Sequence, residues 1–183
     1  MPELVDVPDA VLVDRARSGD QAAFEVLVRR HTVSLYRLAV RLTGSPATAE
    51  DVVQEAWVAA WRFLSGFDGR SALTTWLYRL TTNAALKADR GRRPVPVDDE
   101  VLAARVPAAV SGETSAEESA QRAAVRAAVA ALPISLRAPI VLRYFEDVSV
   151  EETAHILGLT TSTVRGRLQR GRACLAAGLE GWL

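Results

Sequence analysis

The sequence predicts an all-α protein with two helical domains joined by a flexible linker. Apolar residues recur at helical spacing over residues 10–91 and again over residues 119–179, and no segment shows the alternation typical of a strand. Residues 92–118 combine prolines, glycines and clustered acids, a composition typical of a linker. A chain of 183 residues has room for one or two small domains that each bury a core.

The composition predicts a reduced, cytoplasmic protein. The chain is 49% hydrophobic with a formal net charge of +0, which argues against global disorder. No apolar run approaches the length of a membrane span, and the first residues carry acids where a secretory signal needs bases. Cys174 is the lone cysteine, so it forms no intramolecular disulfide or cysteine-based zinc site. We therefore predict no metal and no cofactor.

The first domain is expected to be a run of helices with recognisable starts and stops. Asp20 is placed to cap a helix that Gly44 ends. Ser45 and Pro46 then supply the cap and the first-turn proline of the next helix, which runs to about Leu64.

A polar stripe runs along this second helix, in the motif AEDVVQEAWVAAWR at residues 49–62. Asp51, Gln54 and Glu55 fall on the side opposite the apolar positions, together with Val58. Two carboxylates and an amide in this arrangement suit the docking of a basic partner helix. An ordinary solvated face has the same pattern, and the pattern alone favours that alternative.

The next motif, FDGRSALTTWLYRLTTNAALKADR at residues 67–90, places a glycine-containing loop before a helix. Arg79 and Asn83 recur on the face opposite the apolar stripe, and Trp76 and Tyr78 lie at its boundary. Aromatic rings, amides and guanidinium groups beside a loop suit single-stranded nucleic acid, whose bases stack and are read at their edges. The alternative places Trp76 and Tyr78 in the core.

The second domain has the spacing of a helix-turn-helix. Ser149 and Glu152 match a capping box, in which each side chain bonds the other residue's backbone. Gly158 supplies the left-handed residue of the turn, with the small Ala154 before it and Val164 after it as the anchor of the second helix. Cap, turn and spacing together predict a DNA-binding motif.

The second helix of this motif has a basic face. Four arginines and no acid lie between residues 165 and 172, the electrostatic pattern of a helix that binds duplex DNA. The side chains long enough to reach base edges in the major groove are Arg165, Gln169 and Arg170. Those better placed for phosphates are Ser162, Thr163 and Arg172. The alternative is an amphipathic terminal helix with a solvated basic face.

A resemblance to a known family covers both helical domains. It is carried by three motifs in order: AEDVVQEAWVAAWR, FDGRSALTTWLYRLTTNAAL and VSVEETAHILGLTTSTVRGRLQRGRACL. They resemble those of bacterial extracytoplasmic-function (ECF) RNA polymerase sigma factors of the sigma-70 family. The resemblance implies an alternative transcription initiation factor that binds core RNA polymerase and directs it to promoters. It further implies that the −35 element is read as duplex and the −10 element as melted non-template strand.

The resemblance also implies roles for particular residues. Those implied to dock on the clamp helices of the largest polymerase subunit are Asp51, Gln54 and Glu55. Those implied at the −10 element are Phe67, Asp68, Gly69, Arg70, Ser71, Trp76, Arg79, Asn83 and Lys87. Those assigned to the −35 element are Arg143, Ser162, Thr163, Arg165, Gly166, Gln169, Arg170 and Arg172.

Two positions depart from the family pattern. The family's loop carries a basic residue where Asp68 stands and an acid where Arg70 stands, which affects the preferred base. Gly166 stands where a serine is often found, which removes one potential DNA contact. Many family members are held inactive by an anti-sigma factor, so such a protein is a further candidate partner.

Two other classes of function are alternatives to a sigma factor. A stand-alone repressor or activator would explain the helix-turn-helix equally well, but it leaves the carboxylate stripe and the loop-helix basic patch unexplained. An enzyme has little support, because His31 and His155 have no nucleophile or metal-ligand partner at meaningful spacing. We therefore predict no enzymatic activity.

Overall fold

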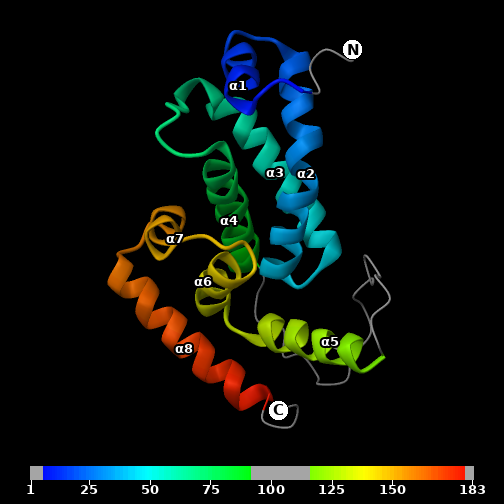
Figure 1. The fold of residues 1–183 in the computed structure, drawn as a ribbon, viewed down its shortest axis with the longest axis vertical. Coiled ribbons are helices and arrows are strands. Elements are labelled where there is room, and N and C mark those ends of the chain that lie inside the picture. Colours follow the sequence, from blue (N-terminus) through cyan, green and yellow to red (C-terminus); the bar gives the residue numbers. More distant parts are fainter. Residues whose placement is uncertain (1–5, 92–115, 180–183) are drawn as a thin grey trace.

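The computed structural model describes residues 6–91 and 116–179, which fold into helices and connecting turns without a strand. The N-terminal domain consists of α1 (Asp9–Arg17), α2 (Gln21–Thr43), α3 (Pro46–Phe63), the 3-10 turn η1 (Leu64–Gly66) and α4 (Leu73–Gly91). The C-terminal domain consists of α5 (Ala116–Ala131), α6 (Ile134–Tyr144), α7 (Val150–Leu157) and α8 (Thr161–Leu179). The predicted all-α class with two helical domains is confirmed (Figure 1). Among the described helices, none has the length and apolar character needed to cross a membrane.

The helix boundaries in the N-terminal domain follow local signals. Asp20 caps α2 by accepting a hydrogen bond from the Ala23 amide, and Ser45 caps α3 by accepting one from Thr48. Gly44 ends α2 at a φ of 68°, in the left-handed region that glycine adopts without strain. These three predictions from the sequence are confirmed.

Two helix starts differ from the sequence expectation. The sequence predicts a start at about Ser71 for α4, whereas the helix begins at Leu73, after a loop in which the Asp68 side chain accepts the Arg70 amide. α5 begins at Ala116, so the last residues predicted as linker are helical. The rest of the linker predicted at 92–118 lies outside the described residues.

The core of the N-terminal domain lies between α2, α3 and α4. Each helix buries one apolar stripe there, with Leu38, Val52 and Leu77 among the side chains that lose nearly all contact with solvent. α1 packs across the beginning of α2, where Asp9 bonds Arg30 at 2.6 Å and His31 at 2.7 Å. The N-terminal domain is thus a compact bundle that holds the outer faces of α3 and α4 in fixed positions.

The predicted helix-turn-helix is confirmed in α7 and α8. Ser149 accepts the Glu152 amide and the Glu152 carboxylate accepts the Ser149 amide, so both halves of the capping box are present. Gly158 has a φ of 63°, and Val164 is fully buried as the anchor of α8. A glycine is also required where α8 crosses α6, because a Cβ on Gly171 would lie 2.8 Å from a side-chain carbon of α6.

The two domains pack directly on each other. α2 contacts α5 and α6, and α4 contacts α6 and α7, so one continuous apolar cluster spans both domains. Figure 1 shows α6 and α7 beside α4, with α5 passing across the end of α2. Arg137 of α6 donates a hydrogen bond of 2.7 Å to the carbonyl of Leu42, in the last turn of α2. The chain therefore has a closed arrangement.

Candidate nucleic-acid interface

The face of α8 predicted to read bases is open to solvent. Arg165, Gln169 and Arg170 are all exposed, because Val164 and Leu168 hold the opposite side of the helix in the core. Arg165 and Gln169 lie one turn apart on the same face. This presentation of an arginine-rich face is the geometry with which a helix enters a major groove.

Hydroxyl groups gather at the beginning of α8. Thr160 accepts the Thr163 amide at 3.2 Å, and its hydroxyl lies 3.0 Å from that of Ser162 and 2.8 Å from that of Thr163. A helix N-terminus with hydroxyl donors suits phosphate oxygens. The structure therefore brings Ser162 and Thr163 together at a place compatible with their predicted role.

The −35 assignment also includes residues beside α8. Arg172 donates to the hydroxyl of Tyr144 at 3.3 Å, and Arg143 lies 3.3 Å from Asp147. Tyr144 is exposed at the end of α6, and sequence reasoning missed it because its only signal was its place next to Arg143. At Gly166 no atom lies within 4 Å of the Cβ position, so a serine would fit there without a clash.

The loop before α4 is held by its own side chains. Phe67 is only 8% exposed and its ring lies 5.1 Å from that of Trp76, so both rings pack inward on each other. Asp68 accepts the Arg70 backbone amide and pairs with its guanidinium group, and these bonds hold the pKa of Asp68 below its usual value. Gly69 lies between them at a φ of 73°. Asp68 and Arg70, whose order is reversed relative to the family pattern, thus bond each other and close the turn.

The outer face of α4 continues from this loop. Ser71 is half-buried at its beginning, whereas Arg79 and Asn83 are exposed along the helix. The Lys87 ammonium group lies 2.6 Å from the carboxylate of Glu55 on α3. The structure therefore joins a residue predicted to bind DNA to one predicted to bind polymerase.

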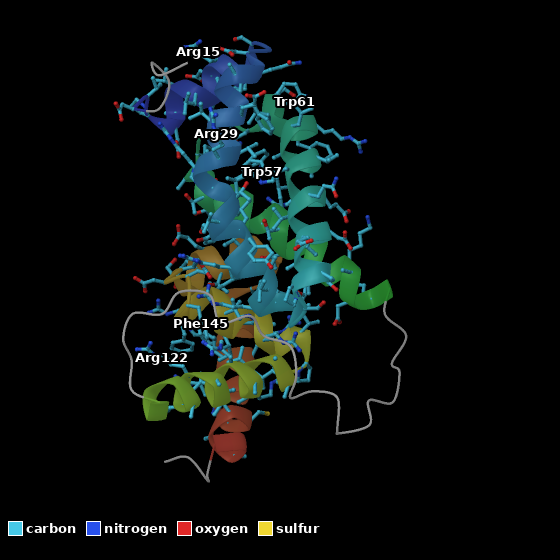
Figure 2. All side chains as sticks on the ribbon, turned by 90° about the vertical axis from the view of Figure 1, so that its right-hand side faces the viewer. Arg15, Arg29, Trp57, Trp61, Arg122 and Phe145 are labelled. Atoms are coloured by element: carbon cyan, nitrogen blue, oxygen red, sulfur yellow. The ribbon has the colours of Figure 1, made fainter. Side chains whose placement is uncertain are left out.

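The polar stripe on α3 has an apolar continuation. Exposed along α3 are the three residues predicted to bind polymerase, Asp51, Gln54 and Glu55. Val58 and Trp61 follow one and two turns after Gln54 on the same side, and Trp61 is 44% exposed (Figure 2). The Trp61 ring packs edge-on against Phe24 with centroids 4.8 Å apart, which fixes its position. Sequence reasoning missed Trp61, although its helical spacing from Gln54 was a usable signal.

The described residues contain no group of three or more histidine, cysteine or acidic side chains that would hold a metal ion. The surfaces that carry the predicted site residues are basic, hydroxyl-rich or mixed polar and aromatic. The fold and these surfaces define a class of protein, a helix-turn-helix DNA-binding protein with a second helical domain.

Comparison with known proteins identifies the family. The family model of Sigma-70 region 2 matches residues 27–94, and that of Sigma-70, region 4 matches residues 122–175. The RNA polymerase sigma-H factor of Pseudomonas aeruginosa is 35% identical over 97% of this chain and 96% of its own length. The ECF RNA polymerase sigma-E factor of Escherichia coli K12 is 37% identical over 91% of this chain and 92% of its own length.

A solved structure agrees with these relatives. CnrH, in complex with the cytosolic domain of CnrY, is 31% identical and superimposes with a TM-score of 0.69, covering 96% of this chain and 99% of CnrH. The chain belongs to the ECF RNA polymerase sigma factors of the sigma-70 family. Its function is therefore that of a sigma factor in transcription initiation.

Proposed function

We propose that this chain binds core RNA polymerase and directs it to promoters by reading two elements in different ways. The C-terminal domain, assigned to residues 119–179, reads the −35 element as duplex. The N-terminal domain, assigned to residues 10–91, binds polymerase and holds the −10 element as unpaired non-template strand. The observation that carries this proposal is the exposed, arginine-rich face of α8 on a fully formed helix-turn-helix.

Duplex reading follows from the chemistry of α8. Arginine donates two hydrogen bonds to a guanine edge, and glutamine pairs in the same way with adenine. We assign such contacts to the exposed Arg165, Gln169 and Arg170, and we assign the phosphate contacts that would set the register to the hydroxyl groups at the helix start.

Strand reading is assigned to the loop of residues 67–71 and to α4. Capturing a base from the duplex costs a few kcal/mol of stacking and pairing, which contacts to the flipped base must offset. The exposed groups of Arg79, Asn83 and Lys87 provide donors for bases and phosphates along α4. The packing of the Phe67 ring against the Trp76 ring anchors the loop on α4.

Polymerase docking is assigned to the outer face of α3. Asp51, Gln54 and Glu55 offer carboxylates and an amide to a basic helix of the largest subunit. Val58 and Trp61 add apolar area at the same place, and a positioned tryptophan is the type of residue that contributes most to interface affinity. This combination favours docking over an ordinary solvated face.

The charge of the chain fits a subunit that acts with polymerase. A formal net charge of +0 gives weak attraction to DNA for the free protein, since phosphate neutralisation by basic groups dominates non-specific affinity. We place the protein in the cytoplasm, where bacterial polymerase acts. The complex of CnrH with the cytosolic domain of CnrY supports a protein as a second partner, and the family resemblance suggests that this partner is an anti-sigma factor.

Run-off transcription tests the proposal. Core polymerase with this protein should initiate from a cognate promoter in a genomic library, and Glu55→Lys should abolish product by losing polymerase affinity. Glu25→Lys is the control, because Glu25 is also exposed but lies on α2 and not on α3. No product from the unmodified chain on any promoter, or nanomolar duplex binding without polymerase, would instead support a stand-alone repressor.

A further inference from the structure

A cavity of about 410 Å³ lies between α2, α5 and the end of α6. It is lined by Arg41 of α2, by Phe145 just after α6, and by the α5 residues Gln121, Arg122, Val125 and Arg126. Figure 2 shows Phe145 and Arg122 beside each other at this place. The volume is within the range of about 300–1,000 Å³ that is usual for small-molecule sites. No residue predicted from the sequence to bind polymerase or DNA lines this cavity.

The lining of the cavity is cationic. It includes three guanidinium groups and no carboxylate. The Arg41 guanidinium has a counter-charge, because the Glu146 carboxylate lies 2.6 Å from it. Within the described ranges, neither Arg122 nor Arg126 forms an ion pair. The cavity therefore has two uncompensated positive charges that an anionic ligand would neutralise.

The two unpaired arginines are placed to bind one ligand together. Arg122 and Arg126 are four residues apart on α5, so their side chains are neighbours on one face of the helix. Like charges at this spacing repel each other, and an anion between them replaces the repulsion with attraction. A guanidinium group donates two parallel hydrogen bonds to a phosphate, so the pair suits a ligand with linked phosphates.

The rest of the lining suits an aromatic ring. Phe145 is 36% exposed, and the Arg41 guanidinium lies 5.2 Å from the centroid of its ring. The exposed part of the Phe145 ring offers an apolar surface on which a second flat ring can stack. Gln121 is exposed on α5, and its amide has both donors and an acceptor for the polar edge of such a ring. Phosphate and aromatic ring occur together in a nucleotide.

We propose that this cavity binds a nucleoside diphosphate, with its phosphates on Arg122 and Arg126 and its base against Phe145. The inference is independent of the proposed function, because neither the site nor its test involves polymerase or promoter DNA. Arg41 belongs to the N-terminal domain, whereas the other lining residues belong to the C-terminal domain. A ligand that contacts both domains stabilises the arrangement in which they pack together.

Calorimetric titration of the full chain with ADP and with GDP tests the site. At about 0.15 M ionic strength, where exposed charges are partly screened, at least one of the two should bind saturably at one site per chain. Arg126→Gln should lower that affinity by about tenfold, the effect of losing one charge-assisted phosphate contact. Arg29→Gln is the matched control, because Arg29 is also an exposed helical arginine, and Figure 2 shows it away from Arg122 and Phe145. The control should keep the affinity of the unmodified chain.

A second variant tests the base contact separately from the charges. Phe145→Leu keeps an apolar side chain and removes the aromatic ring, so the affinity for the nucleotide should fall by about fivefold. The affinity for inorganic pyrophosphate, which has no base, should be the same in this variant and in the unmodified chain. Bound nucleotide should also raise the unfolding temperature of the unmodified chain more than that of Arg126→Gln.

Four results would overturn the proposal. The first is the absence of saturable binding of both ADP and GDP. The second is an equal loss in Arg126→Gln and Arg29→Gln, which would indicate non-specific attraction of anions. The third is equal affinity for pyrophosphate and nucleotide, which would assign the site to an inorganic anion. The fourth is displacement of the nucleotide by a lower concentration of a single-stranded oligonucleotide, which would assign the cavity to nucleic acid.

Discussion

The two surfaces assigned to DNA differ in how they are presented. On α8, Arg165, Gln169 and Arg170 are exposed, and Arg165 has only a loose 3.5 Å pair with Glu151. On α4 and its loop, the assigned groups are largely engaged within the chain, as in the Asp68 turn and the Lys87 pair with Glu55. The face of α8 proposed to read bases is therefore open to solvent in the closed chain, whereas the loop proposed to bind the unpaired strand is held by its own side chains.

This difference agrees with the order of events that promoter recognition requires. Duplex DNA is available before melting, so a preformed helix can dock without rearrangement. An unpaired strand exists only after melting, so internal partners can occupy its binding groups until then without loss of function. In the closed chain, α7 of the helix-turn-helix packs against α4, so the elements proposed to bind the two promoter elements contact each other.

The largest expected effect comes from a substitution that breaks the contact between the two domains. Glu146→Ala leaves Arg41 without its partner, and because Arg41 is one-third exposed we expect a loss of about 2–3 kcal/mol in unfolding free energy, below the value for a fully buried pair. Urea unfolding measures it. Glu151→Ala is the control and should change stability by less than about 0.5 kcal/mol, since its pair is exposed. Equal losses in the two variants would remove Glu146 from the interface.

A second change tests the preformed surface. Arg170→Ala should weaken recognition of the −35 element by about 1–3 kcal/mol, the contribution of one good base contact. Competition between specific and scrambled duplexes for the polymerase complex measures the difference. If the affinity of the polymerase complex falls equally for the specific and the scrambled duplex, Arg170 contacts phosphate and does not read a base.

The closed arrangement should also respond to high pH through Tyr78. Burial raises the pKa of the Tyr78 hydroxyl, a bond with Ser34 works against this, and the Glu146 carboxylate raises it further. Because the pKa of Tyr78 is raised in the folded chain, the stabilisation that Tyr78 contributes is fully present below its unfolded pKa of 10.0. This stabilisation is lost as the pH rises through the pKa of the folded chain. Domain separation, as measured by solution scattering, should therefore increase only above about pH 10. Tyr78→Phe should remove that step, and persistence of the step would assign it to another group.

The smallest expected effect on stability concerns the link between α3 and α4. Lys87→Ala breaks a pair whose groups are 74% and 47% exposed, so the unfolding free energy should change by less than about 0.5 kcal/mol. Open-complex formation should fall more clearly, because Lys87 is free to contact the strand once polymerase engages Glu55. A loss of stability without a loss of open complex would make the pair purely structural.

Local features of the fold could be predicted from the sequence. The caps at Asp20 and Ser45, the capping box before α7 and the turn at Gly158 each depend on residues within one helical turn, so their pattern is visible in a short window. The exposed face of α8 follows from the same periodicity. These features position the surface proposed to bind the −35 element, so the exposure of its base-reading face could be predicted from the sequence.

The contacts between domains could not be predicted in this way. Arg41 and Glu146 are 105 residues apart, and Arg137 lies 95 residues from Leu42. Nothing in the local pattern distinguishes these side chains from ordinary surface charges. The packing of Phe67 against Trp76 could not be predicted either, because an aromatic residue at the boundary of a helical stripe fits both the core and a stacking surface.

Energy transfer between the domains tests the central claim most directly. A donor at Arg29→Cys on α2 and an acceptor on Cys174 of α8 would report their separation, since both positions are exposed. The account predicts that the transfer measured in the free chain drops clearly when core polymerase and promoter DNA are both added. The same transfer in the free chain and in the promoter complex would contradict it.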